Sequence, residues 1–220
     1  MNDFENKSAA GVPATATKIA SALLQINAIK LSPANLFTWA SGWRSPIYCD
    51  NRRILSHPAV RDGVRDAFAE LIRAKYPSVE LIAGVATGAI AHGVLVAQAL
   101  NLPFVYVRSA PKGHGLENLI EGEYAAGQRV VVIEDLISTG GSSLKAVEAL
   151  RDAGLDVLGM AAIFTYGFDT AAQNFAAAGV TLDTLSDYPT LVALAEQQGR
   201  IAATDVETLK KWRTDPASFN

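Results

Sequence analysis

The segment from Val130 to Ser143 constrains the fold of this 220-residue chain more than any other. It begins with four branched apolar residues, which are typical of a strand buried on both faces of a sheet. Two acids follow, then a loop of small hydroxyl and glycine residues, and then a pattern over 144–150 that predicts a helix. Because ligands of open α/β sheets bind at the carboxyl ends of the strands, this junction is the expected functional site.

The loop of this segment has the composition of an anion site. Gly140 and Gly141 allow a tight turn and a close approach of the backbone to a ligand. The helix that follows directs free N–H groups and its positive dipole end to the same place. Four hydroxyl side chains flank the glycines: Ser138, Thr139, Ser142 and Ser143. The loop is therefore predicted to bind a phosphate.

The acids Glu134 and Asp135 would repel a phosphate unless they face another part of the ligand or a cation. Ionised carboxylates accept hydrogen bonds from vicinal hydroxyls, so a ribose 5-phosphate suits both the acids and the loop. The alternative is a phosphate accompanied by Mg²⁺ that the acids hold. The chain contains no G-x-x-x-x-G-K-[ST], and no predicted strand is followed by G-x-G-x-x-G, so two common phosphate loops are excluded.

The composition favours one ordinary globular domain over residues 1–220, with 50% hydrophobic and 19% charged residues. The formal net charge of -3, without a basic run, argues against a nucleic-acid partner. Cys49 is the only cysteine, so the chain has no internal disulfide, which fits a reducing compartment. No apolar leader and no apolar stretch of membrane length are apparent. We therefore expect a cytoplasmic protein without a membrane partner.

The N-terminal part is expected to differ from the rest of the chain. Residues 1–14 are polar or small and are predicted to be poorly ordered. An amphipathic helix is predicted over 17–29, followed by two short strands around a Ser-Gly turn between Leu36 and Arg53. Residues 15–55 are therefore predicted to form a helix followed by a hairpin.

From there on, strands alternate with helices, which predicts a doubly wound, mostly parallel α/β sheet. His57 is interpreted as a capping or surface residue and His92 as part of a helix surface or core. The predicted helices cover 57–76, 90–100, 144–150, 169–178, 188–198 and 205–212. The other predicted strands cover 80–85, 103–107, 155–166 and 180–185, with a short β-hairpin arm over 118–124.

Two further loops carry groups that suit an anionic ligand. The glycine turn from Gly84 to Ile90 joins a strand to a helix, and its backbone could hold a second anion. The segment 108–118 contains one proline and two glycines and is predicted to be flexible. It is either a solvated loop or a lid over a polyphosphate, in which Arg108 and Lys112 supply permanent charge and His114 a proton or a hydrogen bond.

Three segments carry a resemblance to the orotate phosphoribosyltransferases, a family of type I phosphoribosyltransferases. Residues 130–143 resemble the motif of the type I enzymes that binds phosphoribosyl pyrophosphate (PRPP). The pattern R-x-x-x-K-x-H-G at 108–115 resembles the family's catalytic loop. F-T-W-A-S-G-W-R-S-P-I-Y-C-D-N-R at 37–52 resembles its N-terminal signature, which purine-type members lack. The resemblance covers about residues 17–200.

The resemblance implies a type I phosphoribosyltransferase fold with a small N-terminal hood over the nucleobase and a flexible lid loop. It implies transfer of the phosphoribosyl group of PRPP to orotate, which gives orotidine 5′-phosphate and pyrophosphate in pyrimidine biosynthesis. Mg²⁺ would be held mainly through PRPP, with no direct protein ligand. The lid of this family reaches into the partner subunit's site, which implies a homodimer.

The family's roles transfer to matching positions of this chain. Glu134 and Asp135 would bind the ribose hydroxyls, and Lys112, His114 and Asp135 would be catalytic, Lys112 foremost. Ser138 would also lie against orotate, and the turn at 84–90 would hold the pyrophosphate. The implied PRPP site comprises Arg108, Lys112, His114, Glu134, Asp135, Leu136, Ile137, Ser138, Thr139, Gly140, Gly141 and Ser142.

The sequence departs from the family pattern at four positions. Basic residues that occur in many members are replaced by Ala40, Gly88, Ser109 and Tyr166. Tyr48-Cys49 matches the family's base-contacting aromatic pair, and Arg44 or Arg53 is a hypothetical substitute contact for the orotate carboxylate. Two alternatives remain open: a phosphoribosyltransferase for a purine or another base, and a PRPP-sensing regulator that keeps the fold and binds nucleic acid.

Overall fold

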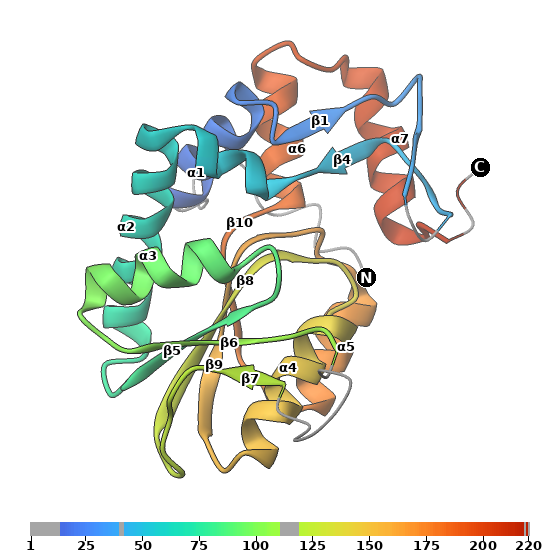
Figure 1. Ribbon diagram of the computed structural model, residues 1–220. Helices are drawn as coiled ribbons and strands as arrows, with labels where there is room; N and C mark the ends of the chain where they lie inside the picture. The colour runs from blue at the N-terminus through green and yellow to red at the C-terminus, as the bar shows by residue number, and fades with distance from the viewer. Residues whose placement is uncertain (1–13, 40–41, 111–118, 218, 220) are drawn as a thin grey trace. The chain divides into compact units, whose positions relative to one another are not determined.

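The computed structural model in Figure 1 describes residues 14–39, 42–110, 119–217 and 219. The chain divides into two compact units. The larger unit is Asn51–Leu185, and the smaller combines Met1–Asp50 with Ser186–Asn220. The expected disorder of residues 1–14 lies outside the described residues except at Ala14, where the first helix begins. A single domain over residues 1–220 stays a prediction.

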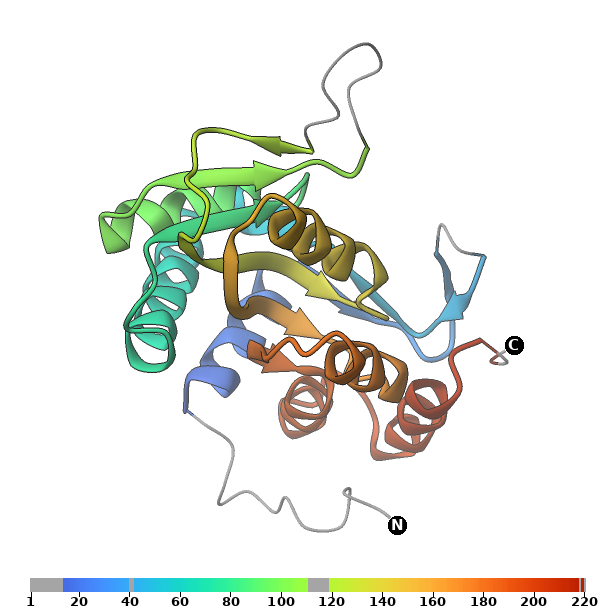
Figure 2. The same ribbon diagram turned by 90° about the horizontal axis from the view of Figure 1, so that it is seen from below.

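The larger unit is built on a six-stranded sheet with the order β10-β9-β8-β5-β6-β7, which Figure 2 shows from below. The pairs β5–β6, β5–β8 and β8–β9 are parallel, and the edge strand β7 is antiparallel to β6. The strands are β5 (Leu81–Val85), β6 (Phe104–Val107), β7 (Ile120–Glu121), β8 (Arg129–Ile137), β9 (Asp156–Thr165) and β10 (Leu182–Asp187). The predicted α/β class with a mostly parallel sheet is confirmed.

Helices pack on both faces of this sheet. Helix α2 packs against α3, and α4 against α5, as Figure 1 shows. Alternate residues of β5 explain the two faces, because Leu81 and Ala83 join the cluster that contains α4 and α5 while Ile82 points the other way. None of the described helices is long and apolar enough to cross a membrane. The elements are η1 (Asn51–Ser56), α2 (Pro58–Lys75), α3 (Ile90–Leu100), α4 (Gly141–Asp152) and α5 (Asp169–Ala177).

The smaller unit packs around an aromatic centre. Trp212 is fully buried, and its ring centroid lies 5.5 Å from that of Trp39 in an edge-to-face contact. The indole Nε1 of Trp212 also donates to the carbonyl of Arg44 at 3.2 Å. The elements are α1 (Ala14–Gln25), β1 (Ile29–Leu31), β2 (Phe37–Thr38), β3 (Arg44–Ser45), β4 (Ile47–Cys49), α6 (Tyr188–Gln197) and α7 (Ala203–Thr214). The predicted hairpin is confirmed by the β2–β3 pair.

Two predicted elements have different bounds. The first helix was expected over 17–29 but ends at Gln25, because Asn27 has a left-handed φ of 54° and Ile29 pairs with Cys49 across β1 and β4. Within the predicted arm at 118–124, the described residues 119–124 do not form a hairpin of their own. Its residues Ile120–Glu121 pair with β6, so they extend the edge of the main sheet.

The strand and helix at the central junction are both longer than predicted. Strand β8 continues through the two acids because β9 offers it partners as far as the pair Ile137↔Thr165. Helix α4 begins at Gly141, three residues before the predicted start. The break between them is at Gly140, whose φ of 81° lies in the left-handed region that favours glycine. The loop between strand and helix is therefore only residues 138–140.

Two helical glycines give a test of this packing. At Gly63 in α2 an added Cβ would meet nothing within 4 Å, so Gly63→Ala should stabilise the fold by about 0.5–1 kcal/mol through helix propensity. At Gly93 in α3 the same atom would lie 2.5 Å from Cε2 of Phe104. Gly93→Ala should therefore destabilise the fold by about 1–3 kcal/mol. Urea unfolding of both variants measures this, and shifts of the same sign would contradict the described packing.

Candidate active site

Two strand-to-helix junctions lie side by side at one edge of the sheet. Strands β5 and β8 are parallel neighbours, with Gly84 opposite Ile133, so their carboxyl ends reach the same edge. The chain passes from β5 through residues 86–89 into α3, and from β8 through residues 138–140 into α4. The peptide bond between Ala86 and Thr87 is cis. Two helix N-termini therefore begin next to the acids of β8.

Glu134 is turned into the protein. Its side chain is 5% exposed, Oε1 accepts from the backbone N–H of Asp135 at 2.9 Å, and Oε2 accepts from the Ser143 hydroxyl at 2.7 Å. Burial, followed by the nearby charge of Asp135, raises the pKa of Glu134 to about 8, although the Ser143 bond opposes the rise. Glu134 thus joins the end of β8 to the first turn of α4.

Asp135 is only partly buried and meets the neighbouring junction. A Cβ added to Gly88 would overlap the carboxylate of Asp135, so the backbone of the β5–α3 loop lies directly against this acid. The main-chain carbonyl of Asp135 accepts from the side-chain amide of Asn51 at 2.6 Å. The close approach explains glycine at position 88, because a longer side chain there would displace Asp135.

The loop 138–140 is supported from α5. Asn174 donates from Nδ2 to the carbonyl of Thr139 at 2.9 Å. A Cβ on Gly140 would lie 2.6 Å from Cε2 of Phe175, so this glycine serves both the turn and the packing. Gly141 and Ser142 are exposed in the first turn of α4, where backbone N–H groups have no helical partner. This arrangement is suited to a phosphate.

The predicted lid joins β6 to β7. The backbone N–H of Arg108 donates to the carbonyl of Leu119 at 2.8 Å, and its guanidinium pairs with Glu121 at 3.4 Å. Both ends of the segment thus meet at the edge of the sheet. Lys112 and His114 lie outside the described residues, so their predicted roles stay predictions.

The structure brings most of the predicted PRPP residues together on β8 and the start of α4. Leu136 is partly buried and Ile137 is fully buried. Ile137 can therefore contact a ligand only through its backbone groups. Asn51 and Asn174 support the site although the sequence did not predict either of them as a site residue. Asn51 belongs to the D-N-R of the N-terminal signature, whereas no sequence pattern marks Asn174.

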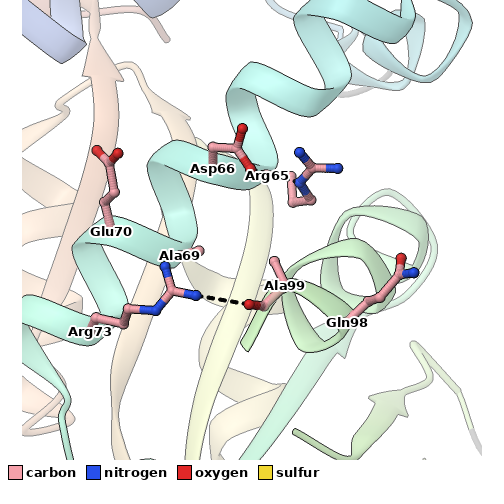
Figure 3. Close-up of a pocket in the computed structure, with 7 residues that line it drawn as sticks. All are labelled: Arg65, Asp66, Ala69, Glu70, Arg73, Gln98 and Ala99. Atoms are coloured by element: carbon pink, nitrogen blue, oxygen red, sulfur yellow. Dashed lines mark hydrogen bonds and ion pairs between the residues drawn. The ribbon is translucent and has the colours of Figure 1, made fainter. Parts of the chain in front are cut away.

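A pocket of about 490 Å³ lies elsewhere on the larger unit, between α2 and α3. Figure 3 shows Arg73 of α2 reaching across it, and its Nη2 donates to the carbonyl of Ala99 in α3 at 2.8 Å. The other lining residues are Arg65, Asp66, Ala69, Glu70 and Gln98. None of the predicted site residues lines it, so it is separate from the acids of β8.

The carboxylates of Glu134 and Asp135 on β8 are the candidate cation ligands beside the loop 138–140. No group of three His, Cys, Asp or Glu side chains that could hold a metal occurs within the described ranges. Hard cations such as Mg²⁺ prefer oxygen ligands, and Asp135 offers a carboxylate that is less buried than Glu134. The donor set fits a cation that the ligand itself largely coordinates.

Comparison with known proteins shows the family of the chain. The phosphoribosyl transferase domain model matches residues 50–186. An orotate phosphoribosyltransferase from Bacteroides fragilis is 60% identical over 200 residues, which cover 91% of this chain and 94% of that protein. The crystal structure of an orotate phosphoribosyltransferase from Aeropyrum pernix superposes with a TM-score of 0.72 at 30% identity, covering 84% of this chain and 99% of that one.

A UMP synthase from Leishmania donovani superposes with a TM-score of 0.76 at 28% identity over 90% of this chain. The matched region is only 42% of that longer chain. The match of the domain model to more than half of the chain defines the class, a phosphoribosyltransferase. This chain belongs, within that class, to the orotate phosphoribosyltransferase family.

The buried acid gives the first test of the site. Glu134 holds its proton more tightly in the folded chain, where its pKa is about 8, than at its ordinary value of 4.5. Protonated Glu134 therefore stabilises the folded chain fully below pH 4.5, and this stabilisation is lost as the pH rises through the folded-state pKa of about 8. The Gln side chain of Glu134→Gln cannot ionise. The melting temperature of this variant should therefore rise relative to that of the parent chain as the pH increases from about 5 to about 8.

Thermal unfolding without ligand, followed across this pH range, measures the difference. The matched control is Glu148→Gln on the exposed side of α4. A difference between the Glu134→Gln and parent melting temperatures that stays constant with pH would contradict the buried, proton-holding state of Glu134.

Proposed function

We propose that this protein transfers the phosphoribosyl group of PRPP to orotate, yielding orotidine 5′-phosphate and pyrophosphate for pyrimidine biosynthesis. One observation carries the proposal. Two helix N-termini, those of α3 and α4, lie beside a single accessible carboxylate, that of Asp135. PRPP has the matching pattern, with a phosphate at one end of a ribose, a pyrophosphate at the other and a diol between them.

The proposal places the ligand in one orientation. The 5′-phosphate lies in the loop 138–142, where hydroxyls and free N–H groups converge. The ribose hydroxyls donate to the accessible carboxylate of Asp135, whereas the buried Glu134, which the sequence also assigned to the ribose, supports the loop through Ser143. The pyrophosphate then lies along the loop 86–89, in which Thr87 is exposed and Gly88 is partly exposed.

The reaction is a substitution at the anomeric carbon of the ribose. The bond from this carbon to the pyrophosphate oxygen breaks, and pyrophosphate leaves with the bonding electron pair. A ring nitrogen of orotate bonds to the carbon and gives up its proton, which passes to the leaving pyrophosphate or to solvent. The residues of the chain hold the ribose and neutralise the leaving charge, and such pre-arranged stabilisation is the main contribution that a protein makes to charge-separating reactions. Arg108, Lys112 and His114 supply the neutralising groups, and Asp135 orients the sugar.

Mg²⁺ accompanies PRPP in this proposal. When bound, it would neutralise charge on the pyrophosphate and on the ribose oxygens. Asp135 is the carboxylate best exposed to face it, because both oxygens of Glu134 already accept hydrogen bonds. The other residues of the site act on PRPP itself.

The choice of orotate over other bases rests on the identity to orotate phosphoribosyltransferases and on the N-terminal signature at 37–52. A product assay with PRPP and a panel of orotate, uracil, adenine and hypoxanthine tests this choice. Orotidine 5′-phosphate should be the dominant product. Consumption of a purine base in its place would favour the alternative enzyme, and no product with any base would favour a regulator.

We place the protein in the cytoplasm and expect a homodimer in which each lid serves the neighbouring site. The single cysteine suits a reducing compartment. The pattern at 108–115 supports a shared lid, since it resembles that of the orotate family.

Lys112 is expected to act on the charge that develops as pyrophosphate leaves. Lys112→Ala should lower kcat by at least about tenfold, because an interaction made mainly in the transition state affects turnover more than binding. Steady-state kinetics with both substrates measure this effect. A change confined to KM would refute the proposed role.

Co-expression with a second variant tests the shared lid. A hybrid of Lys112→Ala and Asp135→Asn subunits would contain one site with both residues intact. Activity well above that of either variant alone is expected, and no gain would argue against sharing.

Asp135 is expected to bind the ribose and not the base. Asp135→Asn removes the charge but keeps the shape, so it should weaken PRPP by about tenfold, the scale of a charge-assisted hydrogen bond, and leave orotate nearly unchanged. Titration calorimetry with each substrate measures the two affinities. Equal losses for both would argue against a diol contact.

A further inference from the structure

Asn51 and His92 are buried polar residues near the acids of β8 that have no role in the predicted site. Asn51 opens η1 and is 1% exposed, and His92 lies in the first turn of α3 and is 2% exposed. Buried polar side chains lose their hydration, so they persist where their hydrogen bonds serve the structure or the function.

A hydrogen-bond relay connects these residues to Asp135. The ring of His92 bonds to the backbone of Asn51. Its Nε2 is buried without a hydrogen-bond partner among the described residues, so we assign this bond to Nδ1, with the carbonyl of Asn51 as the acceptor. The side-chain amide of Asn51 in turn donates to the carbonyl of Asp135 at 2.6 Å. His92 thus acts on Asp135 through Asn51.

The position of Asp135 in the sheet explains why it needs such support. Strand β5 pairs with β8 only as far as Ile133, so Asp135 lies beyond the last pairing on that side. Its carbonyl therefore takes a side-chain donor, Asn51, where no strand continues. The carboxylate of Asp135 lies against the backbone of Gly88. Asp135 is thus in contact with Asn51 through its carbonyl and with the β5–α3 loop through its side chain.

We propose that Asn51 and His92 are positioning residues that hold Asp135 against the β5–α3 loop and so set the affinity for the ribose of PRPP. The inference rests on the proposed function in that Asp135 faces the ribose. Neither residue touches the substrate. The buried ring supports a neutral donor, because burial lowers the pKa of His92 even though the charge of Asp135 acts in the opposite direction.

Single variants test the relay because they should change the KM for PRPP but not the KM for orotate. Asn51→Ala removes the amide donor and should raise the Kd and KM for PRPP about tenfold, the scale of a buried hydrogen bond whose acceptor is left unsatisfied. The KM for orotate should change less than about twofold. Partial unfolding lowers the active fraction without changing a KM. The difference between the two KM values can therefore be read even from a destabilised variant. Equal changes for both substrates, or none, would overturn the proposal.

Two replacements of His92 separate a hydrogen bond from packing. Asn places an amide donor close to where Nδ1 stands, whereas Leu fills the space but cannot donate. His92→Asn should keep PRPP affinity closer to that of the parent than His92→Leu does. The reverse order would assign His92 a packing role and refute the relay. His57→Asn, at the start of α2 and outside the relay, is the control and should bind PRPP as the parent does.

A double-mutant cycle tests whether the pair acts through Asp135. If it does, Asn51→Ala should add little to the loss of PRPP affinity already caused by Asp135→Asn, whereas additive losses would show an independent action. Calorimetry with PRPP measures this without turnover. A parent chain that binds PRPP but forms no orotidine 5′-phosphate would refute the proposed function alone, and a productive parent with neutral variants would refute the relay alone.

Discussion

The parallel pairing of β5 with β8 is the constraint on which the candidate site depends. It brings the two strands to one edge, so that the loops leading into α3 and α4 begin next to each other. The contact between Gly88 and Asp135 follows from this pairing, because a glycine backbone is all that fits beside the carboxylate. The proposed phosphate loop and the proposed pyrophosphate loop then have an acid beside them both, which is the pattern that we propose for PRPP.

The two acids have different environments although they are adjacent in sequence. Glu134 is buried and accepts a hydrogen bond from Ser143, so it connects β8 to helix α4, which follows the proposed phosphate loop. Asp135 is more exposed and receives its support from Asn51 through the main chain. Alternation along a strand explains the difference, since successive side chains point to opposite faces. One acid therefore stabilises the frame and the other is available to a ligand.

The sequence predicts the alternating elements, the parallel sheet and the acid-bearing junction, because each depends on local pattern. It predicts neither that β8 runs through the acids nor that Asn27 ends the first helix, since the first depends on the partner strand β9 and the second on one left-handed residue. Asn174 and the proximity of Gly88 to Asp135 were also missed, because both join segments far apart in the chain. The roles of the lid remain predictions from its residue types.

A crystal structure of the protein with PRPP tests the central claim most directly. We expect the ribose hydroxyls at Asp135, the 5′-phosphate against the N–H groups at the start of α4, and the pyrophosphate along the loop 86–89. The contradicting result is a reversed ligand, with pyrophosphate in the loop 138–142 and the ribose away from Asp135. That outcome would leave the family assignment intact and would overturn the proposed roles of the acids.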